Sequence, residues 1–282
     1  MRTELISIPT PTHPLDAAYY TADGPIKGAA MYCHGNQMNF YVCAARFLAP
    51  YITSLGYNFL AFNRRGHDSV STYNSREAVG GAYQTVVEGI EDNELAAQFL
   101  ANQGFKNPVV IGHSNGGVLA SEHVAHHPAT PALILLSAHA GGNRVTNPQS
   151  ARSFTITEKT DEQTKEAEAL VAAGRPRQLM LIPAWWWVIS ARTFLDRLTN
   201  APDLVENARR IRCPVLFVRG DQEPLENYPA ERFKENCSGP CDIAIISNCD
   251  HFYVGAEERV AKTVTEWLAR TLNLPSPSKG EG

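Results

Sequence analysis

One serine lies among glycines in a pattern that can make it a nucleophile. The segment reads Gly112-His113-Ser114-Asn115-Gly116-Gly117, which matches G-x-S-x-G. An apolar, β-like run over residues 109–112 precedes it, and a helical pattern over residues 115–126 follows it. Glycines allow the sharp turn from strand to helix, which lifts the hydroxyl clear of the sheet, and the helix N-terminus stabilises the negative charge that develops during attack. Ser114 is therefore predicted to be the nucleophile of an acyl-transfer reaction.

A serine hydroxyl attacks an ester at neutral pH only when a general base takes its proton. His251 follows the last predicted strand, in the loop Asn248-Cys249-Asp250-His251-Phe252, from which it can reach over Ser114. We predict that His251 is the base. The other eight histidines are assigned to a surface turn (His13), a helix face (His123), a helix end (His126 and His127) and strand ends (His34, His67, His113 and His139). Of the strand-end histidines, His139 is predicted to be a substrate-binding residue.

A carboxylate must orient the histidine and stabilise its charged form. The strand expected over residues 214–218 leads into Arg219-Gly220-Asp221-Gln222-Glu223, which offers two carboxylates close together in the chain. Both can reach a similar region, but only one can be the partner of His251. The residues by themselves leave the choice between Asp221 and Glu223 open.

The oxyanion of acyl transfer needs two hydrogen-bond donors. One is predicted to be the backbone N–H of Asn115, directly after the nucleophile. The other is expected from the loop His34-Gly35-Asn36-Gln37, because Gly35 lets the backbone approach closely and the N–H of Asn36 comes next. Asn36 can also cap a following helix, and the two roles are compatible.

Short apolar runs alternate with helical patterns, which predicts an α/β protein with a mostly parallel sheet covered by helices on both faces. Strands are expected over residues 1–7, 28–33, 57–62, 109–112, 132–137, 214–218 and 242–246. Helices are expected over residues 39–56, 84–102, 115–126 and 256–272. The core then comprises residues 1–140 and 206–273, and residues 274–282 are expected to form a flexible tail.

Residues 141–205 interrupt this alternation, because no segment within them has a good strand pattern. An insertion of this length is usually functional or a small subdomain. The sequence therefore predicts a mostly helical cap over the carboxyl edge of the sheet, with a helix over residues 161–173. An apolar run over residues 179–189 contains Trp185, Trp186 and Trp187, and at least one of these tryptophans is expected to face the substrate cavity.

The composition is that of a globular protein and argues against several classes of partner. The formal net charge of −4 and the pI near 6.1 leave no basic footprint for nucleic acid or an anionic membrane. No apolar run approaches the ~18 residues of a membrane helix, and the first residues lack the apolar stretch of a signal peptide. The six cysteines match neither a zinc site nor a disulfide framework, although Cys237 and Cys241 are near enough in the chain to bridge. We expect a cytoplasmic protein with reduced thiols, no cofactor and no metal, and the sequence leaves a homodimer open.

Together these motifs resemble the α/β-hydrolase superfamily, over residues 20–270 or so. The resemblance rests on His34-Gly35-Asn36, Arg65-Gly66-His67, residues 112–116, residues 220–223 and Asp250-His251. In many relatives the acid segment reads Gly-x-x-Asp, so the resemblance implies Glu223 as the acid, with glutamate replacing the usual aspartate and Asp221 as the alternative. The His-Gly-Asn triplet is also similar to that of haloalkane dehalogenases, but their nucleophile is an aspartate, and Ser114 argues against that chemistry. Residues 59–68 are similar to a branch that includes fungal siderophore-ester hydrolases.

The expected activity is two-step hydrolysis of a carboxylic ester or lactone of a small, partly apolar substrate, through an acyl-enzyme. Amide, thioester and carbon–carbon bond hydrolysis by the same residues are alternatives. A non-catalytic ligand receptor is an alternative from another class, because fold does not dictate function. Receptors built on this fold often lose one member of the Ser-His-acid set, whereas candidates for all three are present here, and this favours the enzyme.

Overall fold

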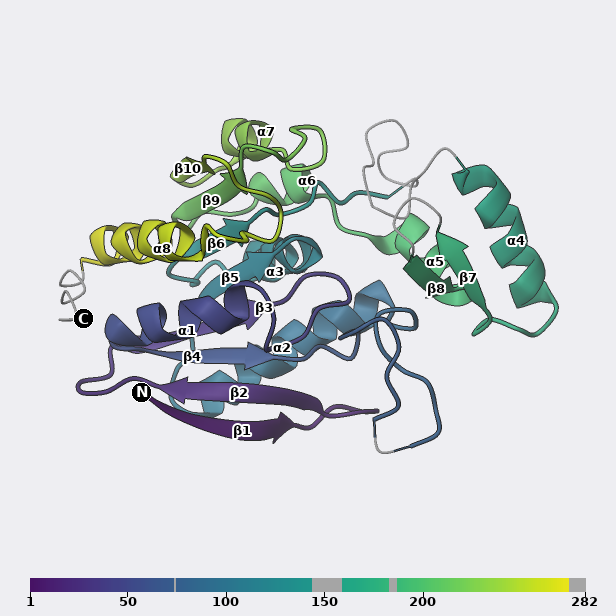
Figure 1. Cartoon of the computed structure of the whole chain (residues 1–282), viewed down its shortest axis with the longest axis horizontal. Coiled ribbons are helices and arrows are strands. Elements are labelled where there is room, and N and C mark those ends of the chain that lie inside the picture. The colour runs from purple at the N-terminus through teal and green to yellow at the C-terminus, as the bar shows by residue number, and fades with distance from the viewer. Residues whose placement is uncertain (74, 144–158, 183–186, 274–282) are drawn as a thin grey trace.

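An eight-stranded sheet runs through the centre of the protein, whose computed structural model describes residues 1–73, 75–143, 159–182 and 187–273 (Figure 1). Its strands are β1 (Arg2–Ile8), β2 (Leu15–Thr21), β3 (Gly28–Cys33), β4 (Tyr57–Phe62), β5 (Val109–His113), β6 (Leu133–Leu136), β9 (Val215–Gly220) and β10 (Cys241–Ile246). Their order across the sheet is β1-β2-β4-β3-β5-β6-β9-β10. β2 is antiparallel to both β1 and β4, and every later pair in this order is parallel. The prediction of a mostly parallel sheet is confirmed.

The register of the parallel strands brings their carboxyl ends to one edge of the sheet. Cys33, the last residue of β3, pairs with Gly112 of β5, and Leu136 of β6 pairs with His113 of β5. Leu136 also pairs with Val218 of β9. The loops that leave these strands therefore start side by side, which is where open α/β sheets place their functional residues.

Helices cover both faces of the sheet, because successive side chains of a strand point to opposite sides. In β3, Ala30 and Tyr32 pack with α1 (Ala44–Ser54) and α8 (Glu257–Thr271), whereas Met31 packs into the opposite layer. That opposite layer contains α2 (Val86–Asn102), α3 (Asn115–His126), α6 (Leu204–Ala208) and α7 (Ala230–Asn236). Burial on both faces explains why β3 and β5 are continuous apolar runs. The predicted fold class, a sheet flanked by helices, is confirmed.

The chain between β6 and α6 forms a smaller body, at the right of Figure 1. It consists of α4 (Thr160–Ala172), β7 (Leu179–Ile182), β8 (Trp187–Ser190) and α5 (Ala191–Asn200), and we call these four elements the cap. β7 and β8 form an antiparallel hairpin, a two-stranded sheet separate from the main one. The cap also has an apolar core of its own, formed by Ala167, Met180, Ile182, Trp187, Ile189, Ala191, Phe194 and Leu198.

The hairpin corrects one prediction, because residues 141–205 were expected to hold no good strand. In β7, Met180 and Ile182 are buried while Leu181 is 53% exposed, which is the two-residue period of a strand. A short apolar run cannot be distinguished from a buried helix by its composition, and the strand period is visible here only over four residues. The helix predicted over residues 161–173 is present as α4.

Two further elements differ from the prediction. The helix expected from residue 39 begins only at Ala44, because Cys43 has a left-handed φ of 54°, which interrupts a helix. Residues 34–43 are therefore a loop beside the carboxyl edge of the sheet, not the first turns of a helix. β2 was not assigned from the sequence, since its Asp16 and paired alanines, Ala17 and Ala18, weaken a strand pattern.

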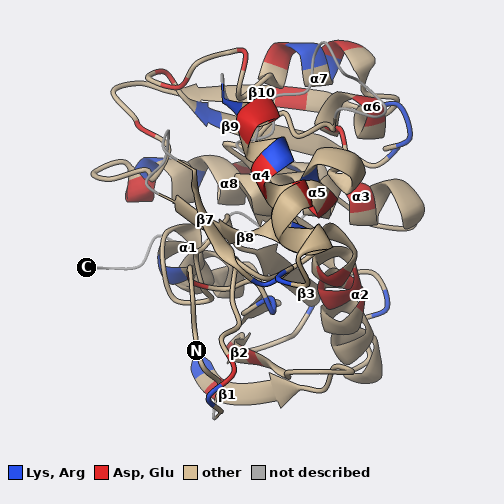
Figure 2. Cartoon of the chain, turned by 90° about the vertical axis from the view of Figure 1, so that its right-hand side faces the viewer, with Lys and Arg blue, Asp and Glu red and all other residues tan. Residues whose placement is uncertain are grey.

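Charged residues of both signs are spread over the helices, as Figure 2 shows for α4 and α7. Within the described part of the chain, no helix is both long and apolar enough to cross a membrane. None of the six cysteines, all of which lie within the described residues, forms a disulfide, and this includes Cys237 and Cys241.

Candidate active site

Ser114 occupies a strained turn between β5 and α3. Its φ of 54° and ψ of −124° are rare for a residue with a side chain, and its N–H donates to the carbonyl of Leu136 at 2.9 Å. The flanking glycines are required by close packing. A Cβ on Gly112 would lie 2.6 Å from the carbonyl oxygen of Gly116, and one on Gly116 would lie 2.2 Å from that of Cys33. The sequence thus holds the half-buried Ser114 side chain at the carboxyl edge of the sheet.

His251 is oriented by a buried carboxylate. Its Nδ1 lies 2.7 Å from Oε1 of Glu223, so Nδ1 carries the proton and donates to the carboxylate. The Glu223 side chain is only 3% exposed, and its Oε2 accepts hydrogen bonds from Oγ of Ser137 at 2.5 Å and from N of Gly220 at 2.8 Å. The hydroxyl of Tyr253 lies 2.7 Å from the same Ser137 Oγ. Two donors, Ser137 and Gly220, therefore fix the carboxylate in the position that orients the His251 ring.

Asp221 does not reach His251. Its two carboxylate oxygens accept the backbone N–H groups of Cys249 at 3.1 Å and Asn248 at 3.0 Å. These hydrogen bonds, from Cys249 and then from Asn248, lower the pKa of the exposed Asp221. Of the two carboxylates that the sequence left open, Asp221 closes the turn before the histidine and Glu223 contacts the histidine itself.

The loop after β3 packs directly against the nucleophile. A Cβ on Gly35 would lie 3.3 Å from Cβ of Ser114, so the backbone of this loop lies close beside the serine. Asn36 follows at this point, and its Oδ1 accepts a hydrogen bond from Nη1 of Arg197 at 3.2 Å. Asn115 is the first residue of α3, where a helix leaves its backbone N–H without an internal acceptor. The two predicted oxyanion donors thus lie in segments on either side of Ser114.

A cavity of about 220 Å³ opens at these residues. It is lined by Asn36, Gln37, Met38, Ser114, His139, Trp187, Tyr228, His251 and Phe252. The structure brings Ser114 and His251 to one cavity, together with the predicted residues Asn36, His139 and Trp187. Trp185 and Trp186 lie outside the described residues. Asn115 lines a smaller neighbouring cavity that shares His139.

A model of the alpha/beta hydrolase family matches residues 32–263 of the chain, which include all of these loops. The chain belongs to this family. A search of the curated proteins finds no match. The hydrolase is similar in structure to Est1E from Butyrivibrio proteoclasticus, with a TM-score of 0.72 and 15% identity over 95% of this chain and 99% of that one. At such low identity this likeness shows the fold alone.

Two other solved structures share the fold. A monoglyceride lipase from Saccharomyces cerevisiae, as a soluble variant with a substrate analogue, has a TM-score of 0.68 and 15% identity, over 96% of each chain. A dienelactone hydrolase from Anabaena variabilis has a TM-score of 0.59 and 13% identity over 95% of this chain and 97% of that one. Each match covers nearly the whole of this chain.

Several residues of the site were missed by the sequence reading. The rings of Tyr228 and Phe252 lie with their centroids 4.9 Å and 5.1 Å from that of His251, and both line the cavity. Burial, and after it the charge of Glu223, raises the pKa of Tyr228, so its hydroxyl stays protonated. Phe252 directly follows His251 in the chain, and this position next to the predicted base could have indicated that it lines the site. Tyr228 and Ser137 carried no local signal, because only the folded chain brings them to Glu223 and His251.

Two buried histidines support the site without lining its cavity. The ring of His113 lies against that of His251, with centroids 4.8 Å apart and planes inclined by 38°, and its Nε2–H donates to the His251 carbonyl at 3.0 Å. Burial, assisted by the charge of His251, lowers the pKa of His113 to about 3. His34 donates from Nδ1 to the Gly35 carbonyl at 2.7 Å and accepts the N–H of Arg64 on Nε2 at 3.0 Å. Burial and the Arg64 charge hold the pKa of His34 well below its ordinary value. Both rings are therefore neutral positioning groups.

Arg197 joins the cap to the loop after β3. Its guanidinium lies 4.9 Å above the ring of Trp187, and it donates to Oδ1 of Asn36 and, at 3.3 Å, to the carbonyl of Gly81. Burial, together with the charge of Arg64, lowers the pKa of Arg197 to about 9, which leaves it charged at neutral pH. Arg64 is also buried, and its guanidinium donates to the carbonyl of His34. Two buried positive charges thus lie behind the loop that carries Asn36.

Proposed function

We propose that this hydrolase cleaves a carboxylic ester or lactone bond in a small substrate through an acyl-enzyme on Ser114. One observation carries the proposal. His251 donates to the buried Glu223 from Nδ1, at 2.7 Å, and lines the same cavity as Ser114. In that tautomer the other ring nitrogen, Nε2, keeps the lone pair that a general base needs.

The mechanism follows from these positions. Nε2 of His251 takes the proton of the Ser114 hydroxyl as its oxygen attacks the substrate carbonyl. The backbone N–H groups of Asn36 and Asn115 hold the oxyanion, and the buried charges of Arg64 and Arg197 add a favourable potential behind the loop. Collapse of the tetrahedral intermediate breaks the ester bond, and protonated His251 gives its proton to the leaving oxygen. His251 then takes a proton from water, which attacks the acyl-enzyme, and the proton returns to Ser114 as the acid is released.

The lining of the cavity supports a small, partly apolar substrate. Trp187, Tyr228 and Phe252 supply aromatic surface, while His139 and Gln37 supply polar groups. A volume of about 220 Å³ suits a short acyl chain or a single ring. The monoglyceride lipase and the dienelactone hydrolase that share the fold are named for an ester and a lactone substrate, which is in keeping with the proposal.

The first experiment is covalent labelling with a fluorophosphonate probe, followed by an activity screen. Wild-type protein is expected to be labelled at Ser114, and Ser114→Ala to be unlabelled while it keeps the wild-type circular dichroism spectrum and melting temperature. On the best substrate from p-nitrophenyl esters of graded length and a lactone panel, Ser114→Ala should lose on the order of 10⁴-fold or more in kcat. Retention of more than a tenth of the activity would sink the assignment of Ser114, and a wild type without label would favour a ligand receptor.

A further inference from the structure

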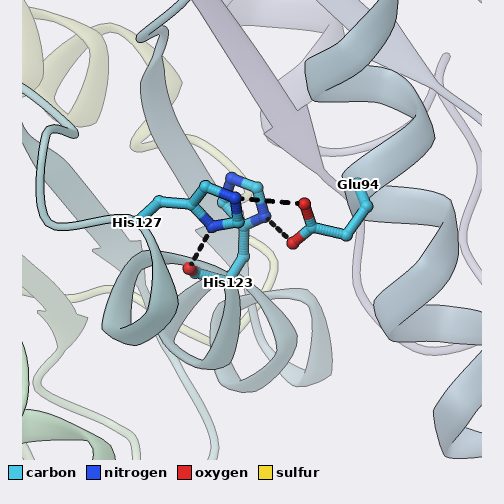
Figure 3. Close-up of side chains that lie close together, drawn as sticks. All are labelled: Glu94, His123 and His127. Carbon is cyan, nitrogen blue, oxygen red and sulfur yellow. Dashed lines mark hydrogen bonds and ion pairs between the residues drawn. The ribbon is translucent and has the colours of Figure 1, made fainter.

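Three potential metal ligands meet on the surface between α2 and α3, far from the cavity. Glu94 comes from α2, and His123 and His127 come from the last turn of α3 and its C-cap (Figure 3). Their ligand atoms all lie within 4.8 Å of one another, which no other group of three His, Cys, Asp or Glu residues achieves among the described residues. The sequence predicted no metal, because Glu94 is distant in the chain. The spacing of the two histidines by four residues, which places both on one helix face, was the signal.

The contacts of His127 require a positive charge within this cluster. Its Nδ1 lies 2.8 Å from the backbone carbonyl of His123, which can only accept, so Nδ1 carries a proton. In the neutral ring Nε2 is then a bare lone pair. That Nε2 lies 3.2 Å from Oε2 of Glu94, which is also an acceptor. Two acceptors so close together are stable only with a positive charge between them, either a proton on the ring or a metal ion.

The surroundings of the cluster favour a positive ion. α2 carries the acidic residues Glu88, Glu91, Asp92 and Glu94 and no basic residue (Figure 2), and of these Glu91 and Asp92 pair with Arg65, whereas Glu94 pairs with His123 and His127. The cluster also lies at the C-terminus of α3, where the helix dipole is negative.

We propose that Glu94, His123 and His127 form a binding site for a divalent transition-metal ion of the Zn²⁺ class. Two imidazoles and one carboxylate are a ligand set that Zn²⁺ and its neighbours prefer, whereas Mg²⁺ and Ca²⁺ prefer oxygen ligands alone. Tetrahedral Zn²⁺ places its ligand atoms about 3.3 Å apart. The Nε2–Oε2 distance of 3.2 Å already fits, and the distance of 2.6 Å between Nδ1 of His123 and Oε1 must widen. Glu94, 42% exposed, can move outward, whereas the 3% exposed His123 is fixed.

The histidine ligands are already oriented by other contacts, a hydrogen bond and the stacking of their rings, as in known metal sites. The Nδ1–H of His127 on the His123 carbonyl fixes both its tautomer and the plane of its ring. The two imidazole rings stack with centroids 4.0 Å apart and an angle of 18° between their planes, so Nδ1 of His123 and Nε2 of His127 face Glu94 together (Figure 3). Water would complete the coordination shell on the exposed side.

The role that this location predicts is structural. His123 is nine residues beyond Ser114 along α3, about 14 Å at the rise of a helix, so the ion would not touch the reacting atoms. It would instead tie the end of α3 to α2. An ion that binds only the folded state stabilises it, by an amount that grows with the ratio of its concentration to Kd.

The test is calorimetric titration of the full chain with ZnCl₂ and, separately, MgCl₂, at pH 7.5 after removal of bound metal with a chelator. The variants are His127→Gln and Glu94→Gln, and the matched control is His126→Gln, which removes a neighbouring exposed histidine outside the cluster. One Zn²⁺ site is expected in the wild type and in His126→Gln, with no Mg²⁺ binding. Both cluster variants should lose this site. At a Zn²⁺ concentration 100-fold above Kd, the melting temperature should rise by about 5 °C in the wild type and the control only.

The remaining outcomes overturn the proposal. Equal Zn²⁺ affinity in all four proteins would assign the ion to the thiols or to the active-site histidines, which none of the variants changes. No Zn²⁺ binding to the wild type would mean that the cluster is an imidazolium–carboxylate ion pair only.

Discussion

The sheet edge and the cap hold their residues in different ways. At the sheet edge, the backbone itself fixes Ser114, since the surroundings of Gly112 and Gly116 pack too tightly to admit a side chain. The cap has a separate apolar core and meets the catalytic loops through single polar contacts, of which Arg197 to Asn36 is one. We infer from this difference that the sheet edge carries out the proposed reaction and that the cap selects the substrate.

Two other hydrogen bonds connect the cap to the rest of the protein. The N–H of Ser190, at the end of β8, donates to the carbonyl of Ala82 at 2.7 Å. The N–H of Val86, at the start of α2, donates to Oδ2 of Asp196 in α5 at 2.6 Å. Both join the cap to residues 82–86, next to the capping box in which Thr85 and Glu88 begin α2. The cap is thus attached near the site but does not supply its reacting groups.

The largest effect that tests this inference is expected at the carboxylate. Glu223→Gln keeps the shape of the side chain but removes the charge that stabilises protonated His251, so kcat should fall by about 10²–10⁴-fold. KM should change little, because Glu223 lies behind the histidine and does not line the cavity. Steady-state kinetics on the best substrate measure both values.

Asp221→Asn is the matched control for that variant. It removes a charge two residues away, at a side chain that accepts backbone N–H groups and does not contact His251. Its kcat should stay within a few-fold of the wild type. If kcat fell strongly in Asp221→Asn and not in Glu223→Gln, the 2.7 Å hydrogen bond between Glu223 and His251 would be irrelevant to catalysis.

Local patterns explain why the sheet edge was predicted well. The strand over residues 57–62 and the helix over residues 115–126 match β4 and α3 residue for residue. Both are bounded by strong signals, a glycine before β4 and the glycine-flanked serine before α3. Ser114 and His251 were predicted on the same kind of signal, since each stands at the junction of a strand and a loop.

Long-range packing explains what was missed. The hairpin of β7 and β8 depends on pairing between residues 179–182 and 187–190. A strand of only four residues has too short a pattern to be predicted from its own sequence. Tyr228 reaches His251, and Glu94 reaches His123, only after distant segments have folded together. The choice between Asp221 and Glu223 was of this type as well, because two carboxylates on one loop differ only in their partners.

Buried histidines distinguish the two regions further. Residues 141–205 contain no histidine, whereas His139 at the sheet edge is buried, and burial followed by the charge of His251 lowers its pKa to about 4. The unfolded chain takes up this proton near the ordinary pKa of ~6.5, and the folded protein does not until pH ~4. Stability is therefore expected to fall as the pH decreases through this window, and His139→Gln should reduce the loss.

Between pH 7.5 and 5.0 the His139 contribution amounts to about 2 kcal/mol. Urea denaturation at both pH values measures it as the difference between wild type and His139→Gln. Glutamine keeps an acceptor for the N–H of Gly141, which His139 Nδ1 accepts at 3.2 Å. The exposed His126 supplies the control, and His126→Gln should retain the full wild-type loss. Equal losses in all three proteins would show that His139 protonates in the folded state as easily as in water.

The contact between Arg197 and Asn36 tests whether the cap influences the reaction at all. Arg197→Met keeps the apolar stem beside Trp187 but removes the hydrogen bond to Oδ1 of Asn36 and a positive charge behind the oxyanion loop. We expect kcat to fall by about tenfold, since a hydrogen bond to a charged group contributes about 1.5–3 kcal/mol and Asn36 keeps its backbone position. An unchanged kcat in a variant with the wild-type melting temperature would confine the cap to substrate binding.

The smallest effect is expected at Trp187, the cap residue that lines the cavity. Apolar surface that leaves water contributes about 25 cal/mol per Å², so a contact of ~50 Å² with an acyl chain contributes roughly 1 kcal/mol, or about fivefold in kcat/KM. Across p-nitrophenyl esters of increasing chain length, wild-type kcat/KM should rise until the cavity is full and then fall. Trp187→Ala should lower kcat/KM about fivefold for the esters that are long enough to contact the cap. It should leave kcat/KM for the acetate ester almost unchanged, because acetate is too short to reach the cap.

Phe252→Ala is the matched comparison, because Phe252 lines the same cavity from the sheet edge, beside His251. If the cap sets chain-length preference, Phe252→Ala should lower kcat/KM for all esters by a similar factor and keep the wild-type slope. A steeper loss for long esters in Phe252→Ala than in Trp187→Ala, with both variants folded, would reverse the assignment. The sheet edge would then determine both the reaction and the substrate, and the cap would serve only to shield the site from water.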